Sequence, residues 1–217
     1  MKSDLQLQHD VMDELEWEPS LDACRIDVNA DGGVITLTGF VASYADKVTA
    51  ERVAKRVYGV KAVANDVDIR IPAEQQRTDA QIAAAALSAL QLDATLPSEQ
   101  IKATVRNGSV TLEGSVDLYC QKEGAERLVR NLRGVKGVSN DIVLKTRPKA
   151  ENVKQRIEAA FTRSAELDAR RVSVQANNGK VILYGNVSSW AERQEAEQAA
   201  WAAPGVSEVE NHLCVMP

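Results

Sequence analysis

The sequence predicts an α+β protein of three tandem αββαβ modules, each a small three-stranded mixed sheet with two helices on one face. A glycine-flanked strand pattern recurs three times, a hairpin-turn signal precedes each copy, and a helical stretch that ends in Gly-Val follows each copy. Self-similarity at a near-constant spacing is typical of repeated structural units. It divides the chain into module one (1–72), module two (75–147) and module three (149–217).

The recurring strand has the form G-x-V/I-x-L-x-G. It occupies residues 33–39, 108–114 and 179–185, which are related by offsets of 75 and 71 without a gap. The same offsets align an aromatic residue (Tyr44, Tyr119, Trp190), the glycine of a Gly-Val pair (Gly59, Gly134, Gly205) and an asparagine (Asn65, Asn140, Asn211). These matches indicate one module present three times.

The first half of each module carries the signals of a helix and a hairpin. Ser3 and Thr78 are each followed three residues later by glutamine, which fits the capping box at a helix start. Apolar residues then alternate with polar ones over 26–30, and a turn at 31–33 leads into the recurring strand. This pattern predicts a β-hairpin, because hairpin turns favour the positive φ that glycine and asparagine adopt.

The second half predicts a helix and a third strand. The second helix is expected to begin near Ser43 and Ser189 and to end at Gly59 and its two equivalents, where glycine suits a left-handed residue after the helix. Alternating apolar residues over 67–71 then predict a third strand. A right-handed crossover through the second helix would place this strand parallel to the second.

Composition predicts a globular protein without strong overall attraction for polyanions. The 217 residues are 44% hydrophobic and 26% charged, and the net charge is −5. Affinity for a phosphate backbone or an anionic bilayer would therefore need a local basic patch. The N-terminus lacks the apolar stretch of a secretory signal, and the longest apolar run, 82–87, is too short to span a bilayer. We expect a cytoplasmic location, or a periplasmic one if a signal has been removed.

Motifs of catalysis and metal binding are absent from the sequence. There is no P-loop, no nucleotide fingerprint and no GxSxG, and His9 and His212 are far apart. The cysteines Cys24, Cys120 and Cys214 show no CxxC spacing, so we interpret them as core thiols or as signs of a reducing compartment. We predict a protein that is not an enzyme, with no cofactor and no metal.

The candidate binding site is the outward face of the second helix. In module two the basic residues lie largely opposite the apolar stripe of that helix, and module one has a weaker set. The candidates are Lys122, Arg127, Arg130, Arg133 and Lys136, with Lys47, Arg52, Lys55 and Arg56. One interpretation is a solvated face, supported by a Glu126–Arg130 pair at i,i+4. The other is a docking surface for anionic lipid headgroups or an acidic partner.

Trp201 is the tenth candidate, because it aligns with Lys55 and Arg130 on that outward face. It either packs against another module or forms an exposed anchor for a partner protein or a bilayer interface. We expect Trp17 to pack within its module and Trp190 to be structural.

The repeated pattern resembles the BON family of bacterial modules, named for osmotically inducible and nodulation proteins. The residues that carry this resemblance are the G-x-V/I-x-L-x-G strand, the aromatic that opens the second helix, and the segment 59–67, GVKAVANDV, with its two echoes. The resemblance implies a non-catalytic module associated with envelope stress and with phospholipid or small-ligand binding. The repeated glycines and asparagines are interpreted as residues that make the fold.

Three functions remain open from the sequence. The first is a stress-associated binding or scaffold protein that uses its outward helix faces on anionic phospholipid or a protein partner. The second is a sensor of a small ligand or cation with a site between modules. The third, single-stranded nucleic-acid binding, is disfavoured because the strands lack a repeated stacking aromatic and the net charge is negative. The oligomeric state is not predicted.

Overall fold

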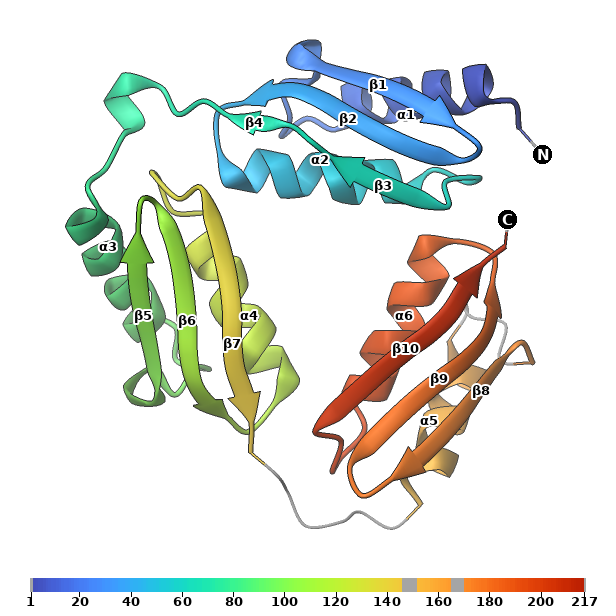
Figure 1. The fold of residues 1–217 in the computed structure, drawn as a ribbon. Helices are drawn as coiled ribbons and strands as arrows, with labels where there is room; N and C mark the ends of the chain where they lie inside the picture. The colour runs from blue at the N-terminus through green and yellow to red at the C-terminus, as the bar shows by residue number, and fades with distance from the viewer. Residues whose placement is uncertain (1, 146–151, 165–169, 217) are drawn as a thin grey trace.

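The computed structural model describes residues 2–145, 152–164 and 170–216, and it confirms the predicted α+β architecture of three modules (Figure 1). The helices are α1 (Asp4–Trp17), α2 (Tyr44–Arg56), α3 (Asp79–Leu92), α4 (Tyr119–Arg130), α5 (Val153–Arg163) and α6 (Trp190–Trp201). The strands are β1 (Ile26–Asp31), β2 (Val34–Val41), β3 (Ala62–Asn65), β4 (Asp68–Ile69), β5 (Ile101–Arg106), β6 (Ser109–Val116), β7 (Gly137–Leu144), β8 (Val172–Asn177), β9 (Lys180–Val187) and β10 (Glu208–Val215).

Each sheet is mixed, with the recurring strand in its centre. In module two, for example, β5 pairs antiparallel with β6, and β7 pairs parallel with β6 on its other side. Module three repeats this order with β8, β9 and β10. In module one the third strand is divided into β3 and β4, but both parts pair parallel with β2. Between them the backbone N–H of Asp66 donates to the carbonyl of Leu37 at 2.9 Å, so the pairing continues.

The hairpin turns have the conformation that the sequence predicts. The two turn residues of module two, Asn107 and Gly108, have φ of 52° and 82°, and Asn178 and Gly179 of module three have φ of 50° and 85°. Positive φ at both positions matches a two-residue turn whose twist fits the twist of the strands.

The second glycine of the recurring strand lets two chain segments approach closely. Gly114 has a φ of 134°, and a Cβ atom added there would lie 2.0 Å from the carbonyl oxygen of Gln100. The equivalent distances are 2.1 Å at Gly39 and 1.9 Å at Gly185. Any side chain at this position would therefore collide with backbone, which explains why the motif ends in glycine three times.

The second helices end earlier than the sequence predicts. They stop at Arg56, Arg130 and Trp201, three or four residues before the glycines at which we expected the ends. Those glycines still have positive φ, 103° at Gly59 and 86° at Gly205, but they belong to the turn that follows the helix. The prediction of a left-handed residue was confirmed, and its place relative to the helix was wrong.

The three modules form a closed ring, with α2, α4 and α6 on the inner side (Figure 1). Each module has its own buried core of mostly aliphatic side chains. The cores are joined by aromatic residues at the helix starts. Tyr44 of module one packs against the core of module two, Tyr119 of module two stacks on Trp201 of module three, and Trp190 of module three packs against the core of module one.

Candidate functional site

An asparagine clamp fixes the second helix of each module to its last strand. In module two, the side-chain amide of Asn140 donates to the carbonyl oxygen of Lys122 at 2.8 Å and to the carboxylate of Glu126 at 3.2 Å, and its own oxygen accepts from the N–H of Ile142 at 3.4 Å. Asn65 and Asn211 make the equivalent three bonds in the other modules. The recurring asparagines therefore have a structural role, as their repetition indicates.

The clamp includes a residue that sequence reasoning missed. The acceptor carboxylates are Glu51, Glu126 and Glu197, which are related by the same offsets as the asparagines. The recurrence was visible in the sequence, but glutamate on an exposed helix face is so common that it gave no signal by itself. The outward face of the second helix therefore carries a repeated glutamate among its basic residues.

Trp201 lies at the contact between modules two and three. Its ring stacks on Tyr119 with the centroids 4.2 Å apart and the planes at 5°. Trp190 makes the contact between modules three and one, where the Nζ of Lys55 lies 5.2 Å from the centroid of its aromatic ring. The indole N–H groups of both tryptophans are buried without an acceptor in the described part of the chain, so stacking and apolar contact dominate these junctions. This placement supports packing between modules as the role of Trp201.

The cations of module one face carboxylates. Arg56 lies 3.0 Å from Glu14 and 3.5 Å from Glu18, and Arg52 lies 3.7 Å from Glu18, so both arginines pair with carboxylates at the C-terminal end of α1 or just after it. Lys55 contacts Glu51 at 2.6 Å. Lys47 completes the set: its side chain has no ion pair among the described residues, and its backbone carbonyl accepts from the asparagine clamp.

These ion pairs help to lower the pKa values of two of the carboxylates. Burial raises the pKa of Glu51, but the hydrogen bond and charge of Lys55 and the amide of Asn65 outweigh it, so the pKa lies below its ordinary value. A hydrogen bond from Ser20 lowers the pKa of Glu18, and the charges of Arg52 and Arg56 add to this effect. Module one therefore neutralises most of its basic face internally.

The cations of α4 in module two lack such partners. Within the described residues, Lys122, Arg127 and Arg130 form no ion pair. The expected Glu126–Arg130 pair is not formed, whereas the equivalent Glu51 binds both its asparagine and Lys55. A polar hollow of about 360 Å³ lies along this face. It is lined by Tyr119, Lys122, Glu123, Glu126, Arg127, Arg130 and Asn140, and by Gln198 of α6.

The two remaining basic candidates lie beyond the end of α4. Arg133 and Lys136 are both exposed and follow the helix in the turn that leads to β7. Lys136 lines a different hollow, at the junction with module one. The ten predicted site residues are therefore not one surface but several, distributed over α2, α4, the turn after α4 and a junction between modules.

The pKa of the Tyr119 hydroxyl is raised because Tyr119 lies at the contact between modules two and three. Burial raises its pKa to about 12, and the negative charges of Glu123, Glu197 and Glu126 add to the effect. Glu197 belongs to module three, so the shift reports on the contact between two modules.

The predictions for the cysteines and for Trp17 need correction. The three cysteines are exposed, so their interpretation as core thiols is wrong. Trp17 is 83% exposed, so the prediction that it packs within its module is also wrong. No three His, Cys, Asp or Glu side chains among the residues that the structure describes are grouped to hold a metal ion. None of the described helices is long and apolar enough to cross a bilayer.

Comparison with known proteins gives a family and one informative relative. Osmotically-inducible protein Y of Escherichia coli (strain K12) is 35% identical over 128 residues, which cover 55% of this chain and 62% of that protein. The match therefore spans less than two thirds of the relative's length.

Two solved structures of CdsD, a structural protein of the type III secretion system of Chlamydia trachomatis, are more distant. One is 16% identical with a TM-score of 0.27 and covers 100% of both chains, and the other is 17% identical with a TM-score of 0.28 and covers 96% of this chain and 91% of that one. At such TM-scores the likeness supports no conclusion about the fold or function of this chain. The BON domain itself matches residues 3–71, 78–146 and 149–217, one segment for each module. The chain therefore belongs to the BON domain family and carries three BON domains in tandem.

Proposed function

We propose that this chain is a non-catalytic binding protein of the stress response, and that module two binds anionic phospholipid headgroups through Lys122, Arg127, Arg130 and Arg133. Membership of the BON family and the similarity to an osmotically inducible protein support a stress-related binding role. The comparisons give no support to the cytoplasmic location expected from the sequence, so the compartment forms no part of the proposal.

The supporting observation is the difference in charge pairing between α2 and α4. Arg52, Lys55 and Arg56 of module one are neutralised by carboxylates of their own module. The α4 cations and Arg133 form no ion pair in the described part of the chain, and Arg127 and Arg133 are exposed. Asp93 senses one of these charges, because its pKa is lowered by hydrogen bonds from Thr95 and, more weakly, by the charge of Arg127. An unpaired cation keeps its full attraction for an external anion, whereas a paired one must first break an existing contact.

The size of the expected effect follows from membrane electrostatics. Each basic residue near an anionic bilayer contributes about 1 kcal/mol, and salt reduces this attraction. Four cations would therefore give an affinity that is measurable at low ionic strength and falls steeply with added salt. The net charge of −5 opposes binding by the rest of the surface, so the attraction has to be local.

The test is co-sedimentation of the whole chain with vesicles of phosphatidylcholine alone and with added phosphatidylglycerol. We expect binding only to the anionic vesicles, and loss of that binding in Arg127→Glu with Arg130→Glu. The matched control is Lys102→Glu with Arg163→Glu, which changes the net charge equally at two exposed positions on other elements. Equal sedimentation with both vesicle types, or equal loss in both double variants, would rule out the lipid function and favour an acidic protein surface as the partner.

A further inference from the structure

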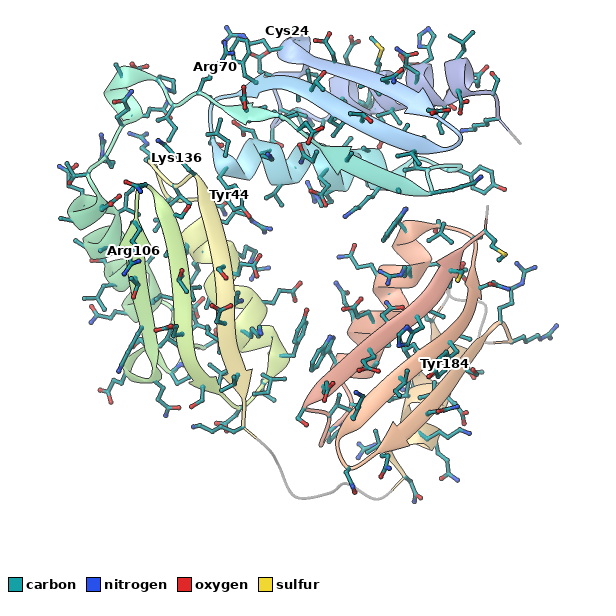
Figure 2. The ribbon with its side chains drawn as sticks, viewed as in Figure 1. Cys24, Tyr44, Arg70, Arg106, Lys136 and Tyr184 are labelled. Atoms are coloured by element: carbon teal, nitrogen blue, oxygen red, sulfur yellow. The ribbon has the colours of Figure 1, made fainter. Side chains whose placement is uncertain are left out.

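A second hollow lies at the junction of modules one and two. It has a volume of about 500 Å³. Module one contributes Arg70, which follows β4, and the linker contributes Arg77. Module two contributes Asp79 at the start of α3, the β5–β6 hairpin turn and the turn after α4. Arg70 and Lys136 are labelled on the two sides of this junction (Figure 2). The hollow is therefore built from both modules and exists only while they are in contact.

The charges that line this hollow are strongly unbalanced. Arg70, Arg77 and Lys136 line it against a single carboxylate, that of Asp79. Both oxygens of that carboxylate are already engaged, since they accept the backbone N–H groups of Asn107 at 2.8 Å and Gly108 at 2.9 Å. None of the three cations forms an ion pair among the residues that the structure describes.

Neighbouring contacts hold the two arginines in place. The guanidinium of Arg70 lies 4.2 Å from the centroid of the Phe40 ring. Arg77 donates from Nη1 to the carbonyls of Glu74 at 3.2 Å and Gln76 at 2.7 Å, which fixes its guanidinium. Gly134 allows the linker to pass this close, because a Cβ atom there would lie 2.8 Å from the Cβ of Arg77. An anion that enters the hollow would meet two guanidinium groups that already contact neighbouring residues, together with the exposed ammonium of Lys136.

The equivalent hollows of modules one and three show why this one differs. Lys2, the counterpart of Arg77, contacts Asp10 at 2.6 Å, and Lys61, the counterpart of Lys136, donates to the carbonyl of Gly32 at 3.3 Å. In module three, Lys154 and Lys180 line the corresponding hollow and contact glutamates.

The sequence explains part of this contrast. Ala85 of α3 replaces Asp10 of α1, so Arg77 has lost the acidic partner that its counterpart has. Among the three hollows, as far as the described residues extend, the one at the junction of modules one and two is the only one in which no lining cation forms an ion pair.

We propose that this hollow binds a phosphate group of a small molecule, held by Arg70, Arg77 and Lys136. Two guanidinium groups offer planar pairs of donors that match the oxygens of a phosphate, and a lysine adds a point charge. The volume exceeds that of one phosphate ion, so it accommodates a pyrophosphate or a phosphate ester. Bound there, the ligand would tie module one to module two.

The experiment is isothermal titration of the whole chain with pyrophosphate and, separately, with glycerol 3-phosphate, which carries the chemistry of a lipid headgroup. We expect saturable binding of at least one, and a Kd that is about tenfold weaker or more in Lys136→Gln and in Arg70→Gln. The matched controls are Lys61→Gln and Lys2→Gln, which remove the equivalent charges of module one and should leave the Kd unchanged. Lys136→Gln removes an exposed side chain without a protein partner, so it tests binding even if Arg70→Gln fails to fold.

Each outcome decides the proposal. Absence of binding by the wild-type chain, or equal weakening in Lys136→Gln and Lys61→Gln, overturns it. Binding of glycerol 3-phosphate but not pyrophosphate supports a headgroup as the ligand, and the reverse supports a free phosphate compound. The vesicle experiment depends on Arg127 and Arg130 instead, so failure of one proposal is separable from failure of the other.

Discussion

Modules one and two share the contacts that build the fold, apart from a third strand that is divided in module one, and they differ in how their surface charges are paired. Both have the same glycine at the close approach of two segments and the same asparagine clamp, with hydrogen-bond lengths that agree within 0.1 Å, 2.9 and 3.3 Å against 2.8 and 3.2 Å for the two amide bonds. In module one, however, Glu14 of α1 and Glu18, which follows α1, form ion pairs with the arginines of α2.

The helix α3 of module two supplies no such partners. Ala89 occupies the position of Glu14, and Asp79 is the only charged residue of α3. Asp93, just after α3 at the position of Glu18, forms no ion pair with Arg127; hydrogen bonds from Thr95 and, more weakly, the charge of Arg127 lower its pKa. The cations of α4 are consequently free of ion pairs within the described residues. The comparison separates residues that build the module from residues that specialise one copy, and the four predictions below test that separation.

The largest effect is expected at the close approach of the two segments. Gly114→Ala would put a Cβ atom 2.0 Å from the carbonyl of Gln100, and Gly39→Ala would put one 2.1 Å from that of Arg25. Each change should lower the free energy of unfolding of its own module by about 3 kcal/mol or more. Urea denaturation followed by circular dichroism measures both. A clearly smaller cost in one module would show that the two are not built alike.

The next effect concerns the asparagine clamp. Asn140→Ala and Asn65→Ala each remove three hydrogen bonds at a part-buried site, so each should cost about 1–3 kcal/mol. The two costs should agree, because the geometry does. Thermal denaturation of the two variants and of Asn29→Ala, on an exposed strand position, provides the comparison.

A pH-dependent effect is expected from Tyr119. Its pKa is raised to about 12 from an ordinary value of 10.0, so the folded state favours the neutral phenol. The resulting stabilisation is complete below pH 10 and is lost as the pH rises through 12. The urea midpoint of the wild-type chain should therefore fall more than that of Tyr119→Phe over this interval. Parallel curves for the two proteins would contradict the raised pKa.

The smallest effect on stability is expected when the arginines of module one lose their carboxylate partners. This change makes the α2 face resemble the α4 face of module two. Glu14→Gln with Glu18→Gln removes partly exposed ion pairs and should cost less than about 1 kcal/mol. It should also increase binding to phosphatidylglycerol vesicles, since Arg52 and Arg56 become available. Glu99→Gln with Glu113→Gln makes the same change of net charge elsewhere, and an equal increase there would show that only total charge matters.

The sequence was sufficient for the fold because the fold depends on local and repeated signals. Positive φ at Asn107 and Gly108, the clamp at Asn140 and the parallel third strand follow from residues that recur at fixed offsets. The site was less predictable, because charge pairing depends on which helix lies opposite. The pairing of Arg56 with Glu14 joins residues of α1 and α2, and helical periodicity within one element cannot reveal it.

Contacts between modules were the hardest to predict. Trp201 and Tyr119 lie on different modules, and stacking between them depends on a docking geometry that no local pattern encodes. Trp17 shows the opposite error, since a large apolar residue that aligns with leucine was expected to be covered and is exposed. The unpaired state of Arg70, Arg77 and Lys136 likewise depends on the juxtaposition of two modules.

The contacts between the modules also determine how many modules are needed to close this ring. Each module presents the aromatic start of its second helix to one neighbour and receives an aromatic from the other, so the contact is directional. A directional contact closes on itself only when the number of copies matches the rotation between them, and otherwise continues into an open assembly. A chain shortened by one module would retain one unmatched donor end and one unmatched acceptor end. Such a fragment is expected to associate head to tail with other copies, whereas the third module satisfies both ends within a single chain.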